Sequence, residues 1–149
     1  MVRQTTRAVG HQYFIAADPQ RVFRAISEPG WLVKWLADEA DLSPTNGGRY
    51  RLSWKDGPTH AGTVLEFVKG RRITLSWEWP GVALKGTRLQ LSVSRKGAGT
   101  LFTIEHLGFP RQETWVDLYA GAEWGWTYFA MNLKSVLETG RDLRSKFDG

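Results

Sequence analysis

The middle of the chain alternates between apolar and polar residues, which is the pattern of β-strands with one buried face and one face in water. Turn-forming pairs such as Asp56-Gly57 and Pro80-Gly81 interrupt this alternation repeatedly. The alternating region predicts strands at 49–54, 62–68, 73–79, 88–93 and 101–106. Two shorter strands are predicted earlier in the chain, at 11–16 and 39–42. Because the connections between successive strands are short, we predict an antiparallel meander of about six or seven strands.

Two short helices are predicted after the first strand. Asp18 precedes Pro19, and an aspartate N-cap followed by proline at the first helical position is typical of a helix start. The apolar residues Val22, Phe23 and Ile26 give this helix one buried side, and Pro29-Gly30 is expected to end it. A second helical segment is predicted at 31–36.

The C-terminal part of the chain, from about residue 113 to 141, has the period of a long amphipathic helix. Gly121 and Gly125 each destabilise a helix by about 1 kcal/mol relative to alanine, so a kink or a separate short helix before Gly121 also fits the pattern. Gly140 is suited to a helix C-cap. The apolar stripe of this helix consists of Trp115, Leu118, Ala122, Trp126, Phe129, Leu133 and Val136.

A single amphipathic helix cannot bury its apolar stripe alone, and the predicted sheet has a matching apolar face. We therefore predict an α+β fold in which the curved antiparallel sheet wraps around the long C-terminal helix. The sequence contains no linker or internal repeat, so we expect a single domain over residues 1–149 with a core from about 11 to 140. A space between the curved sheet and the helix is the candidate binding site.

The composition narrows the class of protein. The 149 residues include no cysteine, which excludes disulfides and cysteine-bound metals and fits a soluble protein of the reducing cytoplasm. No apolar run reaches the roughly 20 residues of a membrane helix, and the N-terminus lacks the apolar stretch of a signal peptide. The net charge is +5, but the Lys and Arg residues are scattered, so we expect no nucleic-acid partner.

Several short segments, taken in order, resemble the START-like superfamily, also called SRPBCC or Bet v 1-like, and within it the family of the activator of Hsp90 ATPase homologue 1. The resemblance runs from about Tyr13 to Glu138. The segments are Asp18 to Ile26, Leu32-Val33-Lys34-Trp35, Gly47-Gly48-Arg49-Tyr50, Gly62 to Glu66, Ile73 to Trp77, Gly99-Thr100-Leu101 and the helix that continues from Gly125-Trp126.

The resemblance implies the helix-grip fold and a range of activities. Such domains bind lipids, sterols, polyketides or other apolar molecules, some are cyclases, aromatases or hydrolases, and the eukaryotic namesake stimulates the Hsp90 ATPase. The additional N-terminal domain of the namesake has no counterpart in this sequence. We therefore expect ligand binding more than a direct chaperone role. No cofactor is implied.

The chain is rich in aromatic residues, with eight Trp, seven Phe and four Tyr. Alternation along the strands and the helix stripe directs several of them into the space between sheet and helix. They either form an aromatic cage for a flat apolar ligand or simply fill the core. The predicted cavity-lining residues are Tyr50, Leu52, Trp54, Trp77, Trp79, His106, Trp115, Ala122, Trp126 and Phe129, and the small residues Gly121, Ala122 and Gly125 are expected to leave room beside them.

The three histidines of the chain are candidates for chemistry. His106 is in the inward phase of its strand, where it could act as a general base or be a buried histidine without a role in chemistry. His60 is predicted to lie on the surface in a turn, and His11 has no visible partner. Because no two histidines lie within four residues of each other, no metal site is predicted. Asp117 and Glu123 are expected on a solvated helix face.

Three functions remain open from the sequence. The first is a non-catalytic domain that binds a small aromatic or lipid-like molecule. The second is an enzyme of the cyclase or hydrolase kind with His106 as its base. The third is a co-chaperone-like interaction module, for which Hsp90 would be the partner. In addition, Trp124 and Tyr128 are four residues apart beside the main stripe and, if exposed, would suit a homodimer interface.

Overall fold

The computed structural model describes residues 6–79, 86–111 and 115–144. The strands are β1 (Thr6–Ile15), β2 (Glu39–Leu42), β3 (Arg49–Ser53), β4 (Thr59–Val68), β5 (Arg72–Trp77), β6 (Thr87–Lys96) and β7 (Gly99–Pro110). The helices are α1 (Pro19–Ser27), α2 (Pro29–Trp35) and α3 (Val116–Thr139).

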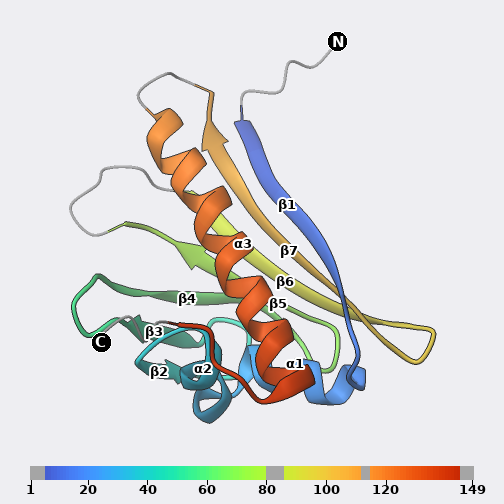
Figure 1. Cartoon of the computed structure of the whole chain (residues 1–149). Helices are drawn as coiled ribbons and strands as arrows, with labels where there is room; N and C mark the ends of the chain where they lie inside the picture. The colour runs from blue at the N-terminus through green and yellow to red at the C-terminus, as the bar shows by residue number, and fades with distance from the viewer. Residues whose placement is uncertain (1–5, 80–85, 112–114, 145–149) are drawn as a thin grey trace.

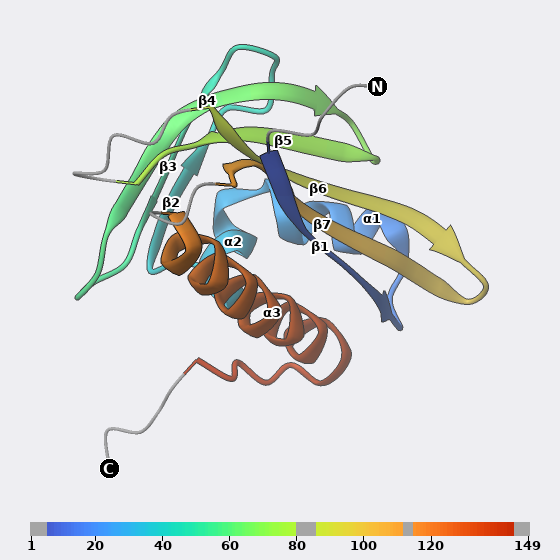
Figure 2. The same ribbon diagram turned by 90° about the horizontal axis from the view of Figure 1, so that it is seen from above.

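All seven strands form one antiparallel sheet in the order β1-β7-β6-β5-β4-β3-β2. The first strand therefore pairs with the last, and β1 and β2 are the two edges. The sheet curves over α3, and α1 and α2 lie beside the helix under the same concave face (Figures 1 and 2). The predicted helix-grip architecture is confirmed. Within the described ranges, no helix combines the length and the apolar character needed to cross a membrane.

The local signals at the first two helices act as expected. The Asp18 side chain accepts a hydrogen bond of 2.9 Å from the Gln20 backbone N–H, and Pro19 is the first residue of α1. The helix ends at Ser27 because Glu28, which precedes Pro29, has extended backbone angles. Pro29 then opens α2, two residues earlier than predicted.

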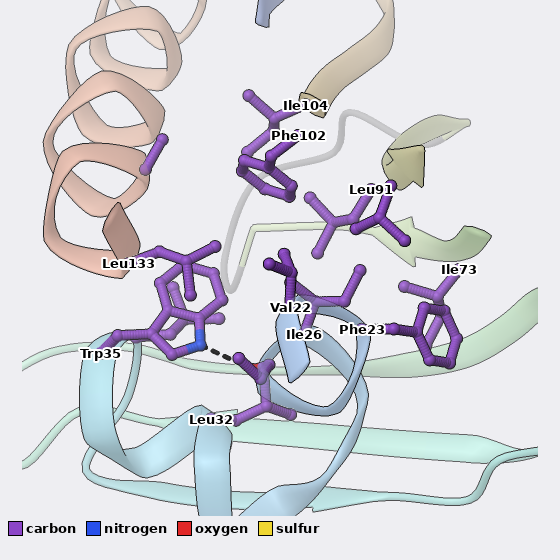
Figure 3. Close-up of a cluster of buried hydrophobic side chains, with 14 of the residues drawn as sticks. Val22, Phe23, Ile26, Leu32, Trp35, Ile73, Leu91, Phe102, Ile104 and Leu133 are labelled. Carbon is purple, nitrogen blue, oxygen red and sulfur yellow. Dashed lines mark hydrogen bonds between the residues drawn. The ribbon is translucent and has the colours of Figure 1, made fainter. Parts of the chain in front are cut away.

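The main apolar core lies between α1, α2, the sheet and the C-terminal half of α3 (Figure 3). Trp35 is fully buried there, and its indole N–H donates a 2.7 Å hydrogen bond to the Ala25 carbonyl. Leu133 of α3 packs into the same cluster, together with Val22 and Ile26 of α1. Each fully buried aliphatic side chain contributes about 1.5–3 kcal/mol relative to an exposed one, so this end of the molecule anchors the helix.

The helix α3 is continuous from Val116 to Thr139, so the alternative of a separate short helix before Gly121 is wrong. It ends where Gly140 adopts a left-handed conformation with φ of 77°, as expected for a glycine cap. Beyond this cap, the tail folds back onto the helix. Asn132, which is fully buried, donates to the Trp35 carbonyl and to Asp142 at 2.9 Å each, and its side-chain oxygen accepts the Leu143 backbone N–H.

The strand β4 differs from its prediction in two ways. It begins at Thr59 rather than at residue 62, which lengthens the β3–β4 hairpin and brings His60 into the sheet opposite Leu52. In addition, the register between β4 and β5 shifts between Val64 and Glu66. Because this irregularity changes the side-chain phase, Val64 is fully buried, whereas Leu65 is 48% exposed.

Candidate functional site

A pocket of about 340 Å³ lies between the N-terminal half of α3 and the β3–β5 part of the sheet. On the sheet side it is lined by Trp54, Pro58, His60, Trp77 and Trp79. On the helix side it is lined by Asp117, Leu118, Gly121, Ala122, Gly125, Trp126 and Phe129. The volume is within the range of small-molecule sites, and most of the wall is apolar.

Small residues on α3 leave the room for this pocket. A methyl group built on Gly121 or on Gly125 would meet no atom within 4 Å outside the helix's own backbone. Because the side chains of Gly121, Ala122 and Gly125 are small, the helix surface is recessed here. This recess faces the indole rings of the sheet. The sequence predicts free space beside these three small residues, and the pocket lies there.

The aromatic side chains of the wall contact one another in a continuous cluster. The Trp77 ring stacks on the His60 ring at a centroid distance of 4.4 Å and meets the Trp126 ring edge-on at 5.1 Å. Phe129 connects to the Trp54 ring at 6.1 Å and to the Trp126 ring at 6.3 Å. Such contacts between aromatic rings contribute about 0.5–1.5 kcal/mol each beyond the buried area, so the wall is formed before any ligand arrives.

Two of the indole rings are also fixed by hydrogen bonds. The Trp54 Nε1–H donates to the Leu36 carbonyl at 2.8 Å, which connects the end of β3 to the end of α2. The Trp126 Nε1–H donates to Nδ1 of His106 at 2.9 Å, which connects α3 to β7. Because each indole N–H already has a partner, these two rings present mainly their carbon surfaces to the pocket.

His106 is fully buried behind the pocket wall and does not line the pocket. Its ring stacks on Trp79 at 5.4 Å, and Phe109 lies 4.6 Å away between centroids. Burial lowers the pKa of His106 to about 3, with a smaller contribution from His60. At neutral pH the ring is therefore uncharged. Since Nδ1 accepts the Trp126 hydrogen bond, the proton is on Nε2, which is buried and has no hydrogen-bond partner among the described residues.

His60 is buried and lines the pocket, so the prediction that it lies on the surface is wrong. Its Nδ1 lies 2.8 Å from the Glu78 carbonyl oxygen. Burial lowers the pKa of His60, although the hydrogen bond to the Glu78 backbone works in the opposite direction. The alternation pattern missed this residue because the hairpin turn was expected to continue through it. The strong hairpin signal at Asp56-Gly57 could have indicated that β4 starts directly after the turn.

Six of the ten predicted cavity residues line the pocket, and four do not. Trp54, Trp77, Trp79, Ala122, Trp126 and Phe129 line it. Tyr50 and Leu52 point to the inner face of β3 but are buried beneath the wall; the Tyr50 hydroxyl donates to the Ser76 carbonyl at 2.5 Å. His106 lies behind Trp79. Trp115 is the N-cap residue of α3 and does not line the pocket. The inward phase of a strand therefore identifies buried residues, of which only some reach the cavity.

The outer face of α3 differs in character from the pocket. Trp124 is 72% exposed, and its ring stacks on Tyr128 at 5.7 Å with the planes nearly parallel. His11 does have a neighbour, since its Nε2 lies 3.3 Å from Oε1 of Glu123 on the same helix. Asp117 is exposed at the pocket mouth. Among the described residues, no group of three or more His, Asp or Glu side chains could hold a metal ion.

Comparison with solved structures places this fold among known ones. DynU16, from the dynemicin biosynthetic locus, matches 93% of this chain at 21% identity with a TM-score of 0.81, and this chain spans about half (49%) of DynU16. MLL2253 from Mesorhizobium loti matches 91% of this chain and 99% of its own length at 24% identity, with a TM-score of 0.79. The Aha1 dimer from Colwellia psychrerythraea matches 91% of this chain and 98% of its own length at 18% identity, also with a TM-score of 0.79.

The TM-scores show that these proteins share the fold of this chain. No curated protein matches the sequence significantly. The family model of the activator of Hsp90 ATPase homolog 1-like proteins matches residues 16–138, which is most of the chain. By this match and by its helix-grip fold, the chain belongs to the activator of Hsp90 ATPase homolog 1-like family.

Proposed function

We propose that this domain binds one small, flat, apolar molecule in the pocket between the sheet and α3. The observation that carries the proposal is the pocket of about 340 Å³, walled by four indole rings and opposed by two glycines of a helix. A helix that only packed against the sheet would be more stable with alanine at those glycines. The aromatic wall suits a flat ligand because aromatic rings stack face to face or edge to face.

A pocket-filling substitution tests this proposal. In Gly125→Leu, the new side chain starts from a point with free space around it and extends into the pocket. In the control Ala120→Leu, the same side chain is added to an exposed position of the same helix. We expect the wild type and Ala120→Leu to bind 2-methoxynaphthalene at one site per chain in isothermal titration calorimetry. Gly125→Leu should bind at least tenfold more weakly while remaining folded.

The proposal is contradicted if the wild type binds neither this probe nor its hydroxyl analogue 2-naphthol, or if Gly125→Leu binds as well as the wild type does. Native mass spectrometry of the purified wild type gives a complementary measurement, since a ligand carried through purification would appear as added mass. The cytoplasmic location expected from the cysteine-free sequence stays a prediction.

An enzymatic role based on His106 has little support from the geometry. A general base must reach its substrate and accept a proton near the working pH. His106 lies behind the wall, its pKa is about 3, and its Nδ1 already accepts a hydrogen bond. We therefore favour binding without catalysis.

A second candidate function concerns association. Trp124 is exposed on α3 and stacks on the half-buried Tyr128, and the solved structure from Colwellia psychrerythraea is a dimer. We propose that this pair contributes to a homodimer or to a partner surface such as that of Hsp90. Sedimentation of the wild type and of Trp124→Gln should then show a dimer that the substitution weakens. A monomeric wild type would contradict the homodimer. If the protein leaves the ATPase rate of a bacterial Hsp90 unchanged, the chaperone role is contradicted.

A further inference from the structure

His60 is a polar group built into an otherwise aromatic wall. It comes from β4, pairs across the hairpin with Leu52, and lies between two indoles, stacked on Trp77 at 4.4 Å and edge-on to Trp54 at 5.9 Å. These two contacts restrain the imidazole ring. Its orientation is therefore determined before any ligand enters.

The hydrogen bond of His60 determines which of its nitrogens carries the proton. Nδ1 lies 2.8 Å from the Glu78 carbonyl oxygen, and a carbonyl oxygen can only accept. Nδ1 must therefore be the donor. In the neutral ring this leaves Nε2, on the side away from that carbonyl, as a hydrogen-bond acceptor. Because burial lowers the pKa of His60, the neutral form is present at pH 7.

The remaining charges around the pocket disfavour an anionic ligand. Among the described residues that line it, none is Lys or Arg, and Asp117 places a carboxylate at the mouth. A carboxylate or phosphate ligand would therefore meet a negative charge and an acceptor nitrogen, and it would find no cation to compensate the loss of its hydration.

We infer that the ligand of this site is an uncharged aromatic molecule that donates one hydrogen bond, from a phenolic O–H or an aromatic N–H, to Nε2 of His60. The inference rests on the proposed function and adds the chemical class of the ligand. An aromatic ring that packs among Trp54, Trp77 and Trp126 would bury His60 further. A ligand without a donor would then leave Nε2 buried and unpaired, and such unpaired groups lower affinity.

The test compares 2-naphthol with 2-methoxynaphthalene, which differ in one hydrogen-bond donor. Isothermal titration calorimetry gives the affinity of each probe for the wild type, for His60→Phe and for the control His11→Phe. Phenylalanine keeps a ring that can stack on Trp77 but has no acceptor nitrogen. We expect the affinity ratio of 2-naphthol to 2-methoxynaphthalene to fall at least about fivefold from the wild type to His60→Phe. It should be unchanged in His11→Phe.

A second readout needs no substitution and so does not depend on the folding of the variant. In the wild type, the ¹⁵N signal of His60 Nε2 should move further on addition of 2-naphthol than of 2-methoxynaphthalene. An affinity ratio that is equal in the wild type and His60→Phe, or equal ¹⁵N shifts with both probes, would overturn this inference and leave the proposed function intact. If neither probe binds the wild type, the proposed function fails, and the inference fails with it.

Discussion

His106 is completely buried, and its neighbours are aromatic rings rather than opposite charges. A positive charge on this ring would have to be taken from water into an apolar environment without a partner, which is why its pKa is about 3. The neutral ring instead accepts the Trp126 indole N–H and thereby fixes one wall of the pocket. Its role is to position Trp126.

Because of His106, we expect the free energy of unfolding to decrease in mild acid. Its pKa is lower in the folded protein (about 3) than in the unfolded chain (6.5), so the unfolded state binds more protons at pH values between the two. Stability therefore falls as the pH falls. Between pH 7.5 and 5, His106 should lower the free energy of unfolding by about 2 kcal/mol, and His60 acts in the same direction.

Urea unfolding at both pH values measures this effect. His106→Asn is the informative variant, because its amide oxygen can still accept the Trp126 N–H but does not titrate. We expect the pH dependence of the free energy of unfolding to be clearly smaller in this variant than in the wild type. Equal pH dependence in the wild type and His106→Asn would contradict this account of His106.

At the scale of elements, α3 has two different halves. Its C-terminal half is held by buried contacts of Leu133, Val136 and Leu137 and by the hydrogen bonds of Asn132. Its N-terminal half contains two glycines and faces the pocket. The glycines weaken the helix where it forms the pocket wall, and the other half provides the anchoring.

Two glycine substitutions in this helix should have opposite effects. Gly121→Ala should raise the free energy of unfolding by about 1 kcal/mol, because alanine favours the helix and the added methyl group meets no atom within 4 Å outside the helix's own backbone. Gly140→Ala should lower it by about 1 kcal/mol, because Gly140 has a φ of 77°, which residues with a Cβ rarely adopt. Thermal and urea unfolding of both variants check this. A destabilised Gly121→Ala would show that the glycine is required for packing.

The sequence predicted these elements well wherever the signal is local. The Asp18-Pro19 helix start, the period of α3 and the Gly140 cap depend on neighbouring residues, and all three are confirmed. The position of His60 and the exposure of Leu65 depend on strand register and on an irregularity between β4 and β5. The role of Asn132 depends on a carbonyl 97 residues away. Such pairings between distant segments leave no pattern in one sequence.

At the scale of the molecule, the anchoring core and the pocket lie at different ends of α3. The core at one end includes Ile26, Trp35 and Leu133, whereas the pocket at the other end is walled by Trp54, Trp77 and Trp79. The two are nevertheless continuous, because Trp77 and Trp126 of the pocket wall belong to the same buried cluster as Leu133. Solved structures that are less than 25% identical to this chain share the same fold.

The indole N–H signals of the eight tryptophans, measured by NMR during titration with 2-methoxynaphthalene, test the central claim most directly. Four tryptophans line the pocket, namely Trp54, Trp77, Trp79 and Trp126. Trp124 is exposed on the outer face of α3 and serves as an internal control. If the pocket is the binding site, the signals of the four lining residues shift to saturation together, while that of Trp124 stays in place. Shifts at Trp124 with the four pocket signals unchanged would contradict the account.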